Sequence, residues 1–282
     1  MTSESAASRS GASGNVCYRH PDRQSFILCQ RCGRTICSQC QTQAAVGVHC
    51  PECVREARAS APRTKPAIVT TLTRKDAPLV TYAIIALCAV VFVLELIFGS
   101  PLITQLVFFA PRTLSEPWRL VTHMFAHSAQ FPFLHVLFNM FTLFMFGPVL
   151  ERMLGRGRFV ALYFLSGLGG AVAVTLLAPG SPVLGASGAI FGLVAAYFVI
   201  QRRAGLNNPT LLVVIIVNLA IGFFPGINVS WQGHVGGLVV GAAIALVYTR
   251  TRNRTQRPLQ VGLIVGIAVV LAAIILLRSL TL

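Results

Sequence analysis

The sequence contains little charge and very little acid. Only 11% of its 282 residues are Asp, Glu, Lys or Arg, and eight acidic residues stand against 23 basic ones. Hydrophobic residues make up 55% of the chain, and the mean hydropathy is +0.72. This scarcity of charge excludes a disordered chain and an ordinary soluble domain, and it is typical of a membrane protein.

Two sequence features are also absent. Residues 1–16 are polar and rich in Ser, Gly and Ala, with no apolar stretch. No cleavable signal peptide is therefore expected, and the first apolar span would act as the targeting signal. The sequence has no H-E-x-x-H motif, which disfavours a membrane metalloprotease.

Seven apolar runs can cross a hydrocarbon core of about 30 Å as helices. They lie near residues 79–98, 133–150, 158–178, 184–201, 209–224, 232–249 and 259–277. The connection 176–186 contains two prolines and two glycines, so the fourth helix is expected to begin late, close to Ser187. The polar connection 224–232 is expected to cover a water-filled cavity beside the start of this helix, since non-helical backbone at membrane depth must face protein or water.

The basic residues are unevenly distributed among the connections. With the N-terminus placed in the cytoplasm, all but Arg112, Arg119 and Arg278 of the 23 Lys and Arg lie on inner segments. This asymmetry follows the positive-inside rule. It accounts for the net charge of +15 without a polyanion, so no nucleic-acid partner is expected.

Seven of the eight cysteines lie between residues 17 and 53. They form four ligand pairs at two-residue spacing: Cys17 with His20, Cys29 with Cys32, Cys37 with Cys40, and Cys50 with Cys53. Eight such ligands match two structural Zn²⁺ ions with closed tetrahedral sites, although His49 could replace Cys50. A disulfide framework would need an oxidising compartment. If the first and third pairs bind one ion and the second and fourth pairs bind the other, the arrangement resembles the cross-brace of B-box and RING-like modules. The sequence leaves open whether this cysteine-rich domain has a protein partner.

Four polar side chains lie inside predicted membrane spans, where they cost free energy. These are His135 and Asn139 on the second span, Ser187 on the fourth and His234 on the sixth. His135 and Asn139 share a helix face because they are four residues apart. Each has an ordinary interpretation as a buried or interhelical polar group. The predicted topology places all four near the outer ends of their spans, which favours one common site.

Small residues follow these polar groups at the four-residue spacing that lets membrane helices approach closely. They are Gly188 and Gly192 on the fourth span, and Gly237 and Gly241 on the sixth. If these faces pack together, Ser187 and His234 come within hydrogen-bond reach. The imidazole can then act as a general base toward the hydroxyl.

The segments "WR" at 118–119, "HVLFN" at 135–139, "GASG" at 185–188 and "GHVGGLVVGAAIA" at 233–245 resemble the rhomboid intramembrane serine proteases in order and in helix placement. The resemblance covers roughly residues 78–250. It implies that Ser187 is the nucleophile and His234 the base, with no carboxylate. It also implies that His135 and Asn139 donate hydrogen bonds to the oxyanion. Phe191 stands where many relatives have a tyrosine that stacks on the imidazole.

The expected fold is an all-α polytopic membrane protein. Its divisions are a disordered N-terminus (1–16), a two-zinc B-box-like domain (17–56), a linker (57–77), a rhomboid-like core of six transmembrane helices (78–250), and a basic loop with a seventh transmembrane helix (251–282). The zinc domain is expected in the cytoplasm, and the active site is expected to open to the outer side.

The expected function is that of a serine endopeptidase that cleaves membrane proteins in or near their transmembrane segments. The alternative is a catalytically silent rhomboid-like protein that binds or escorts membrane clients; such relatives usually lack the serine or the histidine. A transporter that relays protons through His and Asn would give no reason for the GASG turn.

Overall fold

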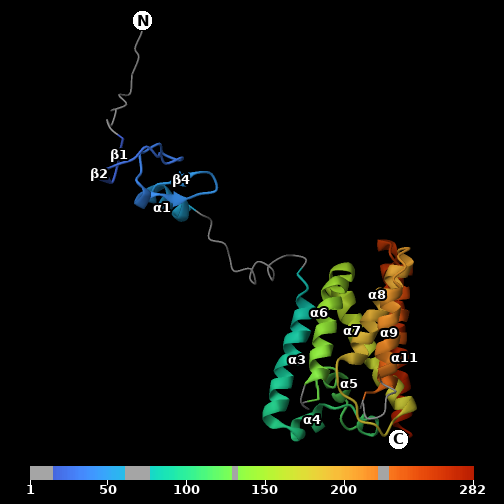
Figure 1. The fold of residues 1–282 in the computed structure, drawn as a ribbon. Coiled ribbons are helices and arrows are strands. Elements are labelled where there is room, and N and C mark those ends of the chain that lie inside the picture. Colours follow the sequence, from blue (N-terminus) through green and yellow to red (C-terminus); the bar gives the residue numbers. More distant parts are fainter. Residues whose placement is uncertain (1–14, 61–76, 129–132, 222–228) are drawn as a thin grey trace. The chain divides into compact units, whose positions relative to one another are not determined.

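The computed structural model describes residues 15–60, 77–128, 133–221 and 229–282. The chain divides into two units, residues 1–67 and 68–282, which are drawn in Figure 1. Most of the predicted N-terminal tail and linker, and residues 222–228 of the predicted cap, lie outside the described residues.

The N-terminal unit is built from short elements around cysteine side chains. Its elements are β1 (Val16–Cys17), β2 (His20–Gln24), the 3₁₀-helix η1 (Ser38–Cys40), β3 (Thr42–Gln43), β4 (Val48–His49) and α1 (Pro51–Ser60). β1 pairs antiparallel with β2, and β3 pairs antiparallel with β4. The buried cluster consists of six cysteines and Ile36. This set is too small for an ordinary hydrophobic core, so a bound metal would have to supply much of the stability.

Every predicted apolar span contains one helix. The helices are α3 (Leu79–Phe98), α6 (Leu134–Leu154), α7 (Arg156–Leu177), α8 (Ser187–Arg203), α9 (Pro209–Ile221), α10 (Trp231–Arg250) and α11 (Arg257–Ser279), which follows η3 (Arg254–Gln256). Among the described residues, five helices are long and apolar enough to cross a membrane, whereas α8 and α9 are shorter. The protein is an integral membrane protein with a six-helix core and one additional C-terminal helix.

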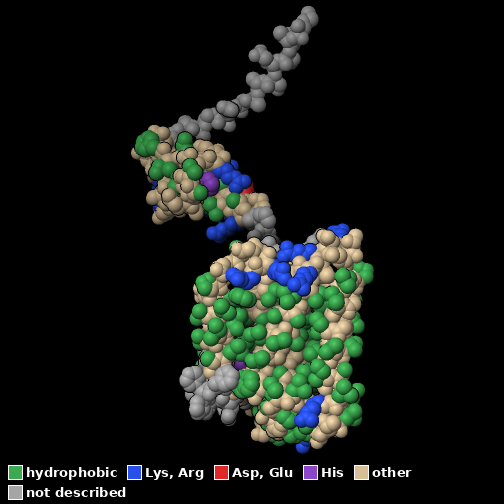
Figure 2. All heavy atoms as spheres, turned by 90° about the vertical axis from the view of Figure 1, so that its right-hand side faces the viewer, with side chains coloured by type: hydrophobic (Ala, Val, Ile, Leu, Met, Phe, Trp, Pro, Cys, Tyr) green, Lys and Arg blue, Asp and Glu red, His purple; other side chains and the backbone are tan. Residues whose placement is uncertain are grey.

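α7, α8 and α10 form the centre of the membrane unit. α10 packs on both α7 and α8, while α3 packs on α6 and α11 packs on α7 (Figure 1). Many side chains of α3, α6, α9 and α11 are exposed and apolar, as a surface in contact with lipid requires. Figure 2 shows Lys and Arg gathered at one end of this unit, next to a broad hydrophobic band.

The first turn of α3 is held by a carboxylate from α6. Glu151 accepts hydrogen bonds from the backbone N–H groups of Val80 (3.0 Å) and Thr81 (2.7 Å), and from the Thr81 hydroxyl (2.7 Å). Arg156 donates to the Ala77 carbonyl at 3.4 Å. The Glu151 contacts satisfy two of the N–H groups that a helix start leaves without partners, and the Arg156 contact holds the residue before the helix.

The connection between α3 and α6 folds into α4 (Ser100–Leu106), η2 (Ala110–Arg112) and α5 (Arg119–Thr122). Arg119 is buried and donates to the carbonyls of Val107 (2.7 Å) and Thr104, and it forms an ion pair with Glu116. Arg119 of the WR segment therefore holds the connection between α3 and α6 together from inside.

Candidate functional site

Ser187 is the first residue of α8. α7 ends at Leu177, and the intervening connection is not helical, as its prolines and glycines predict. Val183 and Phe108 exchange two backbone hydrogen bonds of 2.9 Å, and the Gly185 N–H donates to the His123 carbonyl at 2.8 Å. The connection between α3 and α6 thus fixes the chain immediately before Ser187. The first backbone N–H groups of α8 lack intrahelical partners and remain free to bind an anion.

Gly185 is needed at its position for two reasons. Its φ of +122° is rarely adopted by residues with a side chain. A Cβ at this position would also lie only 2.7 Å from Nε2 of His135. Glycine therefore allows the backbone before Ser187 to pass directly beside the His135 ring.

The structure brings Ser187 and His234 together across two helices. Nε2 of His234, in the first turn of α10, lies 2.9 Å from the Ser187 Oγ. The Phe191 ring stacks on the imidazole at 4.1 Å between centroids and 19° between planes. Nδ1 of His234 is buried without a hydrogen-bond partner among the described residues. Aromatic stacking and helix packing, rather than a carboxylate, therefore orient this ring.

Glycines on α8 and α10 make this approach possible. A Cβ added at Gly237 would overlap the carbonyl of Gly188, and one added at Gly241 would overlap the backbone of Gly192. Backbones this close cannot accommodate any side chain at the contact. The predicted small-residue seam is thus a direct backbone contact that sets the separation of Ser187 and His234.

His135 and Asn139 lie on the same face of α6. The Ser128 N–H donates to Nδ1 of His135 at 3.3 Å, and Nε2 of this ring faces Gly185. Asn139 is buried, and its amide donates to the His135 carbonyl at 2.7 Å. Within the part of the chain that the structure describes, the second amide hydrogen of Asn139 has no acceptor and can serve another one. The site therefore combines a hydroxyl, an imidazole beside it and two polar donors from α6.

One residue at this site escaped the sequence analysis. Glu95, near the end of α3, is fully buried, and its carboxylate accepts from the His127 N–H. The sequence did contain a sign of it, since Glu95 is a lone acidic residue within an apolar span. Burying an ionisable side chain in a membrane costs free energy, so such a residue usually has a function.

Residues 114–251 match the model of the Rhomboid domain. A rhomboid protease of Serratia proteamaculans, GlpG, is 32% identical over 196 residues, which cover 66% of this chain and 68% of that protein. The chain belongs to the rhomboid family. Bacillus subtilis GluP, also a rhomboid protease, is 37% identical over 185 residues, but the match spans only 35% of its length.

The zinc-ligand candidates of this rhomboid form two separate groups. Cys17, His20, Cys37 and Cys40 make the first, and Cys29, Cys32, Cys50 and Cys53 make the second. Within each group all ligand atoms lie within 4.8 Å of one another. The interleaved arrangement agrees with the cross-brace that the pairs resemble. Cys50 takes the ligand position, whereas His49 lies in β4 and is in neither group.

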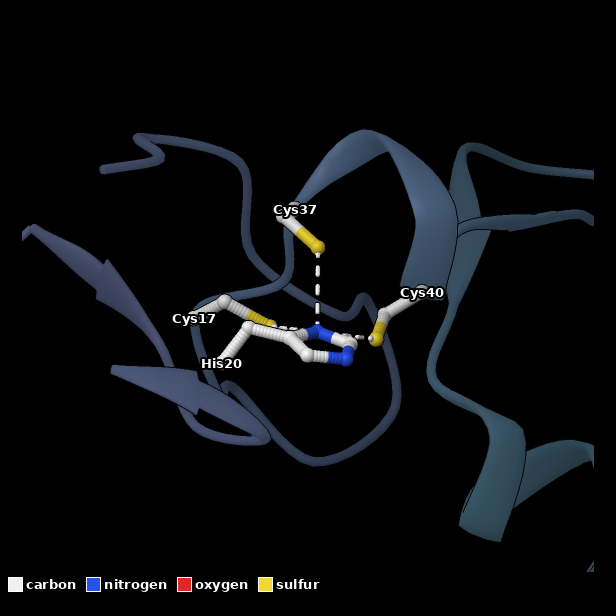
Figure 3. Close-up of side chains that lie close together, drawn as sticks. All are labelled: Cys17, His20, Cys37 and Cys40. Carbon is white, nitrogen blue, oxygen red and sulfur yellow. Dashed lines mark hydrogen bonds between the residues drawn. The ribbon is translucent and has the colours of Figure 1, made fainter. Parts of the chain in front are cut away.

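The atom spacings of both groups suit a tetrahedral metal. In Figure 3, Nδ1 of His20 points between the three sulfur atoms, at 3.8 Å from Cys17 and 3.4 Å from both Cys37 and Cys40. The sulfur atoms of Cys32 and Cys50 are 3.7 Å apart. Tetrahedral zinc, with bonds of about 2.3 Å to sulfur and about 2.0 Å to nitrogen, would separate its ligands by roughly 3.5–3.8 Å. Both groups can therefore hold a metal ion.

Electrostatics within these groups also favour a cation. Although burial opposes ionisation, backbone N–H groups of Cys37 and Arg19 lower the pKa of the Cys17 thiol to about 6. Burial and the neighbouring sulfur atoms of Cys17 and Cys37 raise the pKa of Cys40 to about 11. Several thiolates crowded together repel one another, and a divalent cation at their centre would allow all of them to ionise.

Proposed function

We propose that this rhomboid is an active intramembrane serine endopeptidase. The observation that carries the proposal is the 2.9 Å contact between Ser187 Oγ and His234 Nε2 at the start of α8. A hydroxyl becomes a nucleophile when a base accepts its proton within hydrogen-bond distance, and both groups are present here.

The proposed reaction begins when Ser187 Oγ attacks the carbonyl carbon of the scissile peptide bond. His234 Nε2 takes the hydroxyl proton and then delivers it to the leaving amine, so that the C–N bond breaks and an acyl-enzyme forms. Water then attacks the ester carbonyl while His234 Nε2 accepts a proton from this water. His234 returns that proton to Ser187 Oγ as the acyl C–O bond breaks, which restores the hydroxyl and the neutral base and releases the new C-terminal carboxyl group. Phe191 keeps the ring in register throughout by stacking on it.

Three donors would stabilise the oxyanion of the tetrahedral intermediates. They are the Nε2–H of His135, the free amide hydrogen of Asn139 and the backbone N–H of Ser187, which begins α8. Loss of one such donor typically costs about 2.7–4 kcal/mol of transition-state stabilisation, or roughly 10²–10³ in kcat.

The proposed substrates are membrane proteins cleaved in or near a transmembrane segment. A regular helix hides its carbonyls in backbone hydrogen bonds, so the scissile bond must first unwind. Segments weakened by Gly, Ala, Pro or Ser are therefore the favoured substrates. By the positive-inside rule, we place the zinc domain in the cytoplasm and the active site toward the outer side.

We also propose that the chain follows the domain division predicted above and that a protein partner binds the N-terminal domain. Both cysteine groups of that domain are proposed to hold structural Zn²⁺. The closed Cys₃His and Cys₄ ligand sets leave no position for a substrate, which supports a structural role. The proposed hydrolysis assigns no step to the metal, because Ser187 and His234 supply the nucleophile and the base.

The test combines a covalent probe with cleavage of a transmembrane substrate. The full-length protein in proteoliposomes should be labelled by a fluorophosphonate and should cleave a reporter with a Gly/Ala-rich transmembrane helix. Ser187→Ala and His234→Ala should abolish both signals, whereas Ser181→Ala, at an exposed serine of the same connection, should keep them. A folded wild-type protein that is neither labelled nor active would favour the silent, client-binding alternative.

A further inference from the structure

Glu95 is a buried acid for which helix formation and lipid contact give no reason. It lies in the last turn of α3 and has no exposed surface. A carboxylate there faces the negative end of the helix dipole. No Lys or Arg forms an ion pair with it in the part of the chain that the structure describes. Burying such a group without a cation costs free energy, so its hydrogen bonds indicate a role that offsets this cost.

Both oxygens of Glu95 receive the same donor. The His127 backbone N–H lies 3.2 Å from Oε1 and 3.1 Å from Oε2. The His127 ring is buried, and its Nδ1 is 3.0 Å from the Phe125 carbonyl, to which it donates. The loop after α5 is thus tied to α3 through one backbone N–H that both carboxyl oxygens of Glu95 share.

The next backbone N–H along the chain reaches the proposed oxyanion residue. Ser128 N–H donates to Nδ1 of His135 at 3.3 Å, and the rings of His127 and His135 are 5.3 Å apart. An N–H group cannot accept a hydrogen bond, so Nδ1 must carry the lone pair. In neutral imidazole the proton is then on Nε2. That nitrogen faces Gly185, next to Ser187.

We propose that Glu95 is a positioning residue. It holds the His127 N–H, and through the chain it places the next N–H, that of Ser128, against Nδ1 of His135, so that His135 presents a protonated Nε2 to the reacting carbonyl. The inference rests on the proposed proteolytic function. With the other tautomer, a lone pair would face the developing negative charge, and the site would lose a donor. Glu95 acts only through His135 and does not touch the substrate.

Variants at position 95 separate this role from simple packing. Glu95→Gln keeps an oxygen acceptor for the His127 N–H and should retain kcat within about 3-fold. Glu95→Leu removes the acceptor and should lower kcat by roughly 10- to 100-fold with little change in KM, and by no more than His135→Ala does. Leu96→Ala, at the exposed neighbouring position, is the matched control and should leave kcat unchanged.

A double-mutant cycle supplies the decisive comparison. If Glu95 acts through His135, then Glu95→Leu should cost nothing further in a His135→Ala background. An equal loss in both backgrounds, or no loss in the wild-type background, would overturn the proposal while leaving the protease assignment intact. A wild-type protein that neither reacts with the fluorophosphonate nor cleaves substrate would overturn both.

A spectroscopic measurement covers the case in which Glu95→Leu does not fold. ¹⁵N NMR of histidine-labelled wild-type protein, with His135 assigned from the His135→Ala spectrum, distinguishes a protonated nitrogen from one with a lone pair. We expect Nε2 protonated and Nδ1 unprotonated. The opposite tautomer in active enzyme would refute the proposed role of Glu95.

Discussion

Adding one methyl group at Gly237 should separate Ser187 from His234. A Cβ there would overlap the Gly188 carbonyl, and its next contacts are the carbonyl carbon at 2.7 Å and Cα at 3.2 Å. These neighbours are backbone atoms of α8 and cannot rotate away. Because nonbonded heavy atoms pack at roughly 3.5 Å, α10 must retreat by about 1 Å or more.

Such a shift would lengthen the 2.9 Å contact between Ser187 and His234 beyond hydrogen-bond range. A misplacement of about 1 Å can cost roughly 10²-fold in rate, so Gly237→Ala should lower kcat by about that factor. Overpacking should also destabilise the protein by about 1–3 kcal/mol. The assay is cleavage of a transmembrane reporter in proteoliposomes, alongside thermal unfolding.

Matched glycine variants test the reasoning. Gly262→Ala and Gly266→Ala lie on α11, where an added Cβ meets nothing within 4 Å, and they should leave kcat and Tm nearly unchanged. Gly188→Ala should be milder than Gly237→Ala, since its closest contact would be 3.3 Å. If Gly237→Ala keeps more than about a third of wild-type kcat, backbone contact does not set the geometry of the pair.

Three further predictions concern other parts of the chain. Phe191→Leu should lower kcat by up to about 10-fold because it removes the ring that stacks on His234, whereas Phe191→Tyr should keep kcat within about 3-fold of wild type. Equal kcat values for the two variants would argue against a role for stacking. Cys29→Ser should remove about one zinc ion per chain, measured by mass spectrometry, and should unfold the N-terminal unit without changing the Tm of the membrane unit. His49→Ala should retain two zinc ions per chain, and loss of zinc from this variant would contradict the ligand assignment. Glu151→Leu should destabilise the protein by about 2–4 kcal/mol, since N–H groups of Val80 and Thr81 lose their acceptor, with Glu151→Gln intermediate; an unchanged unfolding midpoint would refute this.

Much of the architecture could be predicted from local sequence patterns. The seven apolar runs locate the helices α3 and α6 to α11 within a few residues, because helix length across a bilayer is fixed by its thickness. The spacing of the glycines on α8 and α10 predicts the close contact near Ser187 and His234, since small residues four apart form one stripe on a helix. The C-x-x-C and C-x-x-H pairs likewise indicate metal ligands by spacing alone.

Other features depended on contacts that no local pattern encodes. Glu151 reaches a helix start 71 residues earlier in the chain, and Glu95 reaches a loop N–H 32 residues later. Whether His49 or Cys50 serves as a ligand depends on how β4 is turned. The sequence by itself determined which residues could react or bind metal, because spacing places them on a helix face or a knuckle. Only the tertiary structure decided the partner of each one, because the rotation of packed helices and the path of the connection between α3 and α6 set which donors meet which acceptors.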